Sequence, residues 1–220
     1  MIFRNRSDAG RQLAGRLLHL KDQDPVVLAL PRGGVPVAFE VAEALGAPLD
    51  LLLVRKIGAP GYPELAAGAV VDGSRPETVL NEDIVRQLQV SDAYIEQEAA
   101  RQLAEIERRR AAYLRGRPPV ALDGRTAVVV DDGIATGATV RVALRALVAS
   151  GAAQRVVLAA PVVPLDVAKA LQGLCDEAVF LDTPRDFRAV GLHYDDFRQT
   201  EDTEVVALLD RAAAQMTGAA

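Results

Sequence analysis

Two adjacent acids followed by small, hydroxylated residues stand out between residues 128 and 140. Three valines, residues 128–130, predict the end of a buried strand, and Asp131 and Asp132 follow directly. The next segment, residues 135–139, leads into a stretch with helical spacing. Small side chains at the start of a helix let several backbone N–H groups point at one anion, and the helix N-terminus adds partial positive charge. The pattern therefore predicts an anion site at residues 135–139.

The two acids indicate what else this ligand carries. A carboxylate repels an anion but accepts hydrogen bonds from the hydroxyl groups of a neighbouring sugar. The combination therefore suits a phosphorylated sugar better than a bare phosphate. Two other nucleotide motifs do not match, because no Lys follows Gly137 as a Walker loop requires, and G-x-G-x-x-G is absent.

The segment resembles the 5-phosphoribosyl-1-pyrophosphate (PRPP) signature of the type I phosphoribosyltransferases. In that signature a hydrophobic strand precedes two acids, a short spacer and a T-G-x-T phosphate loop, and Asp131, Asp132 and residues 136–139 match it. The resemblance implies that the two acids are catalytic and orient the ribose hydroxyls. It also implies a 5-phosphate site formed by Ala135, Thr136, Gly137, Ala138 and Thr139. The alternative is an ordinary strand-to-helix turn with two solvated acids.

A second strand–loop–helix unit precedes this one. An apolar run, residues 25–30, ends in Pro31-Arg32-Gly33-Gly34, and a helical stretch closed by Gly46 follows. Glycines let the backbone approach an anion closely, and a guanidinium can hold the anion with two N–H groups. The resemblance implies that Arg32, Gly33 and Gly34 bind pyrophosphate and that the Pro31–Arg32 peptide bond is cis. A solvent-facing Arg at the end of a strand is the alternative.

Two cations follow the next predicted strand, residues 49–54. Arg55 and Lys56 stand at its carboxyl end, where open α/β sheets bind ligands. The Gly- and Pro-rich residues 57–64 predict a mobile, irregular loop. By the resemblance this is the catalytic loop, in which Arg55 and Lys56 close over the pyrophosphate and exclude water. A solvated strand end is the alternative.

The remaining pattern predicts one α/β domain with a mostly parallel sheet flanked by helices. Further strands are expected at 68–71, 78–80, 155–160 and 178–181, the first two as a hairpin, and further helices at 7–20 (capped by Ser7), 91–116, 165–174 and 204–215. The resemblance implies a Rossmann-like core at about 20–182, with a helical insertion at 82–116 and a small hood at 183–203. The three ligand loops all follow strands, so we expect them to meet at one edge of the sheet. Residues 108–110, three arginines, are interpreted as a solvated face.

The expected hood, residues 183–203, is where the resemblance places the acceptor. It resembles the hood segment of purine phosphoribosyltransferases, with a different spacing to Val190-Gly191. Phe187 would then stack on a nucleobase. His193 and Asp195 are interpreted as members of a structural polar cluster, and acid–base roles are the alternative.

The composition excludes several classes of protein. A net charge of −5 over 220 residues argues against an extended surface for nucleic acid. The single Cys175 excludes an internal disulfide and a thiolate metal cage. The longest apolar run, residues 156–165, is too short for a membrane span. We therefore expect a cytoplasmic protein with no membrane or nucleic-acid partner.

These patterns together predict a PRPP-dependent phosphoribosyltransferase that acts on a nitrogenous base, with a purine as the first choice. Mg²⁺ would be held mainly by PRPP oxygens, with Asp131 and Asp132 as further candidate ligands. The family resemblance implies a homodimer. Two alternatives stay open: a regulator that binds PRPP or a nucleotide without turnover, and a sugar-phosphate hydrolase, which lacks an evident metal cluster to activate water.

Overall fold

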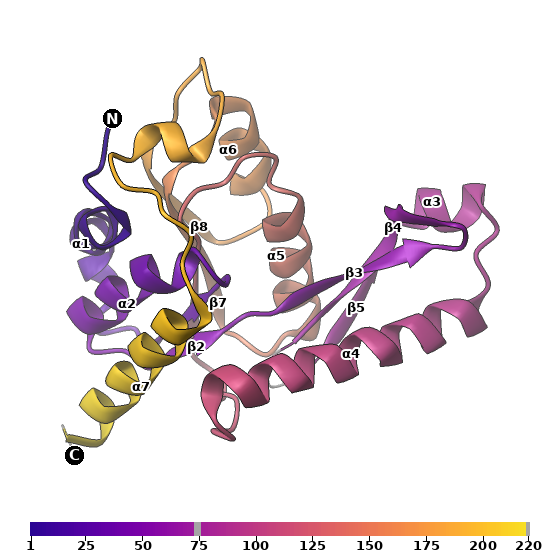
Figure 1. The fold of residues 1–220 in the computed structure, drawn as a ribbon, viewed down its shortest axis with the longest axis horizontal. Coiled ribbons are helices and arrows are strands. Elements are labelled where there is room, and N and C mark those ends of the chain that lie inside the picture. The colour runs from indigo at the N-terminus through magenta and orange to yellow at the C-terminus, as the bar shows by residue number, and fades with distance from the viewer. Residues whose placement is uncertain (73–75, 219–220) are drawn as a thin grey trace.

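The computed structural model describes residues 1–72 and 76–218, and its core is a five-stranded parallel sheet (Figure 1). The strand order is β2-β1-β6-β7-β8. A separate three-stranded antiparallel sheet has the order β3-β4-β5. The strands are β1 (Pro25–Ala29), β2 (Leu49–Leu51), β3 (Val54–Ala59), β4 (Tyr62–Val71), β5 (Glu77–Leu80), β6 (Thr126–Val130), β7 (Arg155–Val162) and β8 (Glu177–Asp182). The predicted α/β class with a parallel sheet is confirmed.

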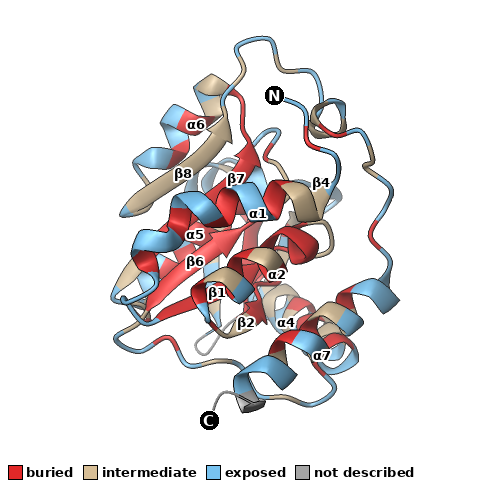
Figure 2. Ribbon diagram, turned by 90° about the vertical axis from the view of Figure 1, so that its left-hand side faces the viewer, coloured by how far each residue is buried: buried red, intermediate tan, exposed pale blue. Residues whose placement is uncertain are grey.

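The parallel sheet is buried on both faces. Successive side chains of a strand point to opposite sides of the sheet, and those of the central strands pack into two different apolar clusters. In β1, Val27 and Ala29 belong to one apolar cluster, and Val26 and Leu28 belong to the other. Figure 2 shows α1 and α2 in front of the buried central strands. Helices α1 (Arg6–Leu17) and α2 (Gly34–Leu45) pack in the first cluster, and α5 (Ala138–Ser150) and α6 (Leu165–Gln172) pack in the second.

Local signals set the helix ends, with one correction to the expected caps. Asn5, not Ser7, caps α1, because its side-chain oxygen accepts a hydrogen bond from Asp8 N at 2.9 Å. Gly46 ends α2 with φ +64°, a conformation that costs glycine little. Ser91 caps the long helix α4 (Asp92–Leu114), which begins where the sequence predicts a helical pattern.

The predicted strand at 49–54 is confirmed only for Leu49–Leu51, and the prediction of an irregular loop at 57–64 was wrong. The chain leaves the parallel sheet after β2, and β3 pairs antiparallel with β4, with Lys56 opposite Ala69. The glycines and prolines do not break this hairpin. Gly58 lies at a register shift, and Gly61 takes φ +74° in the tight turn.

The antiparallel sheet and the helices that follow it form an arm, residues 54–114, which extends from the core (Figure 1). The arm contains β3, β4, β5, α3 (Glu82–Gln87) and α4. The predicted pairing of 68–71 with 78–80 is confirmed within the longer strands β4 and β5, and residues 73–75 of the connecting turn lie outside the described residues. Helix α3 was not expected.

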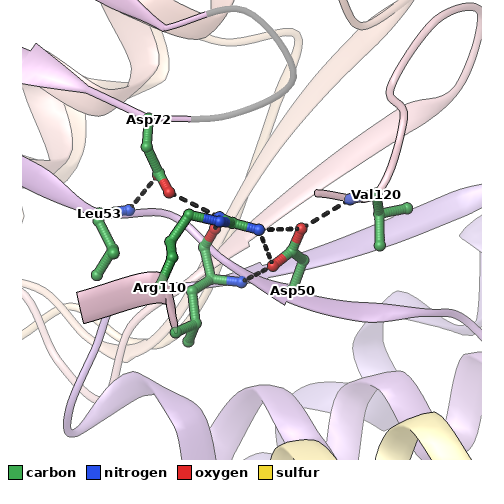
Figure 3. Close-up of polar contacts among 6 residues, drawn as sticks. Asp50, Leu53, Asp72, Arg110 and Val120 are labelled. Carbon is green, nitrogen blue, oxygen red and sulfur yellow. Dashed lines mark hydrogen bonds and ion pairs between the residues drawn. The ribbon is translucent and has the colours of Figure 1, made fainter. Parts of the chain in front are cut away.

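A buried ionic network fixes the base of the arm to the core (Figure 3). Arg110 Nη2 on α4 donates to both carboxylate oxygens of Asp50 at 2.8 and 3.0 Å, and its Nη1 donates to Asp72 Oδ2 at 2.6 Å. The three side chains are 12%, 5% and 3% exposed, respectively. The expectation that all three arginines of 108–110 are solvated was therefore wrong for Arg110.

The C-terminal residues pack against the N-terminus before they form a last helix. Phe3 exchanges backbone hydrogen bonds with this segment, from Phe3 N to His193 O and from Asp195 N to Phe3 O, both at 2.8 Å. Residues 183–200 contain one short 3-10 helix, Val190–His193, and α7 (Asp202–Gly218) then packs against α2, α4 and β2. None of the described helices is long and apolar enough to cross a membrane.

Candidate functional site

The loops that follow β1 and β6 touch each other at the carboxyl edge of the parallel sheet. Leu30 N donates to Val130 O at 2.9 Å, which joins the two strand ends. A Cβ atom built on Gly33 would lie 2.0 Å from Asp132 Oδ2, and one on Gly34 would lie 2.8 Å from Val130 O. Both glycines are therefore needed for the loops to approach. The expected meeting of these two loops is confirmed.

The loop after β1 offers unpaired donors. The Pro31–Arg32 bond is cis, as the sequence resemblance predicts. Within the described residues, the backbone N–H groups of Arg32 and Gly33 donate to no protein atom. The Arg32 side chain is 37% exposed, and its Nη1 lies 3.5 Å from Asp202 Oδ1. The loop thus places a guanidinium and two free N–H groups at the start of α2.

The loop after β6 has the geometry of an anion cradle. Residues 135–139 are exposed except for Gly137, which takes φ +72° at the start of α5. In the part of the chain that the structure describes, the N–H groups of Ala135, Thr136, Gly137 and Thr139 have no hydrogen-bond partner. Ala138 N donates to Thr136 Oγ1 at 3.4 Å. Free N–H groups at a helix N-terminus attract an anion, so this loop can hold a phosphate.

The two acids between these loops share one cation. Asp131 Oδ1 accepts a hydrogen bond from Asp132 N at 2.9 Å, and Asp132 Oδ2 accepts one from Arg6 Nε at 2.7 Å. Burial and the negative charge of Asp132 raise the pKa of Asp131 well above its usual range, and the charge of Arg6 acts in the opposite direction. Asp131 Oδ2 and Asp132 Oδ1 receive no N–H or O–H donor from the described residues.

Arg6 is the residue that the sequence analysis missed. Its side chain is 12% exposed, its Nη1 donates to Arg198 O at 2.7 Å, and its guanidinium lies 3.9 Å from the centre of the Phe197 ring. Tyr194 donates its hydroxyl proton to the backbone oxygen of Asp132. The N-terminal and C-terminal segments therefore hold Asp132 together. No spacing in the sequence signals this contact, because 126 positions separate Arg6 from Asp132.

The third predicted loop does not join the other two. Arg55 Nε donates to Gln102 Oε1 on α4 at 3.0 Å, and Lys56 Nζ donates to Glu64 Oε2 at 3.0 Å. Both side chains line a separate cavity of about 360 Å³ within the arm. Among the described contacts, neither cation reaches residues 31–34 or 131–139. The three loops were expected to meet at one edge of the sheet. The loops after β1 and β6 do meet there, but Arg55 and Lys56 do not reach them.

The aromatic residue proposed for the base lies in a cluster beside the N-terminus. The Phe187 ring stacks on His193, with ring centres 5.8 Å apart. His193 Nδ1 lies 3.3 Å from Met1 O and 3.5 Å from Asp182 Oδ2, which fits the structural interpretation of His193. The side chain of Asp195 is exposed. Stacking of Phe187 on a ligand stays a prediction.

The described residues contain no group of three or more His, Cys, Asp or Glu side chains that could hold a metal ion. Asp131 and Asp132 thus supply at most a pair of carboxylates, one of which is already bound to Arg6. A divalent cation at this edge would need most of its ligands from a bound substrate or from water.

Comparison with known proteins places these residues in a family. The family model described as phosphoribosyl transferase domain matches residues 2–195, which include Arg6 and both anion loops. Proteins of two Mycobacterium tuberculosis strains, provisionally named phosphoribosyl transferase, are 53% identical over 212 residues. The match covers 96% of this chain and 47% of theirs, so the chain spans about half the length of these curated relatives. The protein TT1426 from Thermus thermophilus is 47% identical to this chain in sequence. Its crystal structure matches the structure of this chain with a TM-score of 0.81, and the match covers 95% of this chain and 98% of that one.

Proposed function

The chain belongs to the phosphoribosyl transferase domain family, and on that premise we propose that it transfers the 5-phosphoribosyl group of PRPP to a nitrogenous base and releases pyrophosphate. One observation carries the proposal. Two loops whose N–H groups have no partner among the described residues touch each other, and between them lies a pair of acids, each with one oxygen that no described N–H group contacts. PRPP has the matching chemistry, because its phosphate groups stand at two ends of a ribose that carries free hydroxyls.

Each part of PRPP has a partner in this arrangement. Residues 135–139 would hold the 5-phosphate at the N-terminus of α5. Arg32, with the N–H groups of Arg32 and Gly33, would hold the pyrophosphate. Asp131 and Asp132 would accept hydrogen bonds from the ribose hydroxyls. Binding at both ends fixes the anomeric carbon between them, so remote binding energy positions the reacting atom.

The reaction is a displacement at the anomeric carbon. A nitrogen of the acceptor forms the new bond to carbon and gives up its proton to water, and the carbon–oxygen bond to pyrophosphate breaks with its electron pair leaving on oxygen. Negative charge on the acid pair stabilises the positive charge that develops on the sugar, and Arg32 stabilises the charge of the leaving group. This route requires no protein nucleophile.

Arg6 would act on this reaction as a positioning residue. Its ion pair fixes one oxygen of Asp132, so that the other oxygen faces the ligand. Its positive charge also limits the repulsion between the two acids, which otherwise favours protonation of Asp131. Without Arg6 the pKa of Asp131 would therefore rise further.

The residues fit Mg²⁺ only as a companion of the substrate. Mg²⁺ retains water and binds substrate phosphates together with one or two carboxylates, and this edge offers at most the pair Asp131 and Asp132. When bound with PRPP it would supply positive charge to the leaving pyrophosphate.

A regulator that binds PRPP without turnover is the second candidate, and one observation favours it. Arg55 and Lys56, proposed to close over the pyrophosphate, are engaged by Gln102 and Glu64 within the arm. Catalysis with their help would require these contacts to break. The acceptor, for which a purine is our first choice through Phe187, and the homodimer are also proposals.

The test is to incubate the protein with PRPP, Mg²⁺ and a panel of purine and pyrimidine bases, and to follow pyrophosphate and nucleotides by mass. We expect one nucleotide to form, and Asp131→Asn with Asp132→Asn to abolish its formation. Arg101→Met, on the exposed side of α4, is the matched control and should be fully active. Tight PRPP binding without consumption of any base would support the regulator, and absence of PRPP binding would refute both candidates.

A further inference from the structure

A second polar cavity opens beside the pyrophosphate loop. It has a volume of about 720 Å³ and is lined by the C-terminal half of α4, the first turns of α7, and Pro31 and Arg32. Its charged lining consists of Arg32, Arg108, Arg109, Arg115, Asp202 and Asp210. Four guanidinium groups and two carboxylates thus line the cavity, with Arg108 and Arg109 paired to Glu105 and Arg115 paired to Asp210. The volume is in the usual range for small-molecule sites, ~300–1,000 Å³.

A carboxylate of the protein itself lies among these cations. Asp202 Oδ1 accepts a hydrogen bond from the Tyr113 hydroxyl at 2.7 Å and lies 3.5 Å from Arg32 Nη1. That hydrogen bond and the charges of Arg32 and Arg109 lower the pKa of Asp202. The Asp202 side chain is 67% exposed, so it can turn into solvent. The cavity therefore already contains an anionic group of the protein, and that group is exposed to solvent.

The rest of the lining indicates which anions fit. Arg32 Nη1 lies 3.5 Å from the Asp202 carboxylate, and Arg109, whose Nε donates to Glu105 Oε1 at 3.0 Å, lines the same cavity from α4. Guanidinium groups from two elements around one cavity suit a ligand with several anionic oxygens, since each can bind two of them. Ala112, Val206 and Ala207 add an apolar wall that could accommodate the remainder of a larger molecule.

We propose that this α4–α7 cavity binds a diphosphate group, either free or carried by a nucleoside, which takes the place of the Asp202 carboxylate between Arg32 and Arg109. Arg32 also belongs to the loop that we assign to the pyrophosphate of PRPP. An occupant of the cavity therefore competes for a side chain of the reaction site, and PRPP binding responds to it.

The experiment measures binding of inorganic pyrophosphate and of ADP to the full chain by isothermal titration calorimetry, for the wild type and three variants. Asp202→Asn keeps an acceptor for Tyr113 but removes the competing charge, so affinity should rise at least fivefold. Arg109→Ala should lower it at least tenfold. Arg101→Ala, on α4 outside the cavity, should leave it within twofold. A greater response of ADP than of pyrophosphate identifies the nucleoside-borne group, and the reverse identifies the free one.

Equal affinities in the wild type, Asp202→Asn and Arg109→Ala would overturn the proposal, because the diphosphate would then bind only at the loops. PRPP titrations in the same variants keep this result separate from the proposed function. If PRPP binds and the affinity for the diphosphate is unchanged by both substitutions, only the cavity proposal fails. If PRPP does not bind while the diphosphate responds as expected, only the transferase proposal fails.

Discussion

Replacement of Arg110 tests the buried network at the base of the arm. Arg110→Met keeps most of the length of the side chain and the helix propensity of α4, but removes the cation between Asp50 and Asp72. Two carboxylates that are 5% and 3% exposed would then face each other without a counter-charge. Removal of one partner from a buried ion pair costs ~3–5 kcal/mol, so we expect a loss of that size in the free energy of unfolding at pH 7.5.

The pH dependence of this loss makes the prediction specific. Burial raises the pKa of Asp72 to about 6, although Arg110 acts in the opposite direction. Without Arg110 this pKa rises further, and each added unit contributes ~1.4 kcal/mol to the difference between acid and neutral pH. The loss measured by urea unfolding should therefore be smaller at pH 5 than at pH 7.5.

Arg101→Met is the matched control, because the same change is made on the same helix at a side chain that is 74% exposed. It should change the free energy of unfolding by less than ~0.5 kcal/mol. A loss below ~1 kcal/mol for Arg110→Met, or a loss that does not depend on pH, would refute the electrostatic account of the network.

Three further predictions concern single side chains. The pKa of Asp72 is raised to about 6 in the folded state, so the contribution of Asp72 to stability is present below pH ~4 and is lost as the pH rises through about 6. In urea unfolding, the free energy of unfolding of the wild type relative to Asp72→Asn should therefore fall by up to ~3 kcal/mol over this range. Arg6→Gln should weaken PRPP binding about tenfold or more and move its acidic limb to higher pH, because the pKa of Asp131 loses the lowering charge of Arg6; an unchanged pH profile in titration calorimetry would contradict this role. Gly33→Ala should abolish PRPP binding because its Cβ would lie 2.0 Å from Asp132 Oδ2, whereas Gly15→Ala, with no atom within 4 Å of its Cβ, should bind PRPP normally.

Most of the fold could be predicted because strong local patterns determine it. The valine-rich strands that are buried on both faces, such as β6, read as continuous apolar runs, and Gly46 and Ser91 mark helix ends. The arm was harder to predict. Gly58 and Gly61 are compatible with a loop and with a bulged hairpin, and only the pairing of β3 with β4 decides between them.

The candidate site could be predicted where its residues are neighbours in the sequence. Asp131 and Asp132 share one short segment with the phosphate loop, so their spacing carries the signal. Contacts across the fold carry no such signal. Arg6 approaches Asp132 only after both chain ends fold onto the same edge, and Arg55 turns to Gln102 because β3 packs against α4.

The two arginine networks differ in a way that separates the proposed binding site from a structural ion pair. Each contains two aspartates and one arginine, and in each burial raises the pKa of one acid, Asp72 in the first and Asp131 in the second. Around Arg110, all four carboxylate oxygens accept hydrogen bonds, from Arg110 or from the backbone N–H groups of residues 51, 53 and 120. Around Arg6, one oxygen of each acid receives no N–H or O–H donor from the described residues, and two loops with free N–H groups adjoin them. Unused acceptors beside unused donors cost free energy unless water or a ligand satisfies them. The network around Arg110 therefore attaches the arm to the core. The network around Arg6 keeps unpaired hydrogen-bonding groups, which the proposed ligand would satisfy.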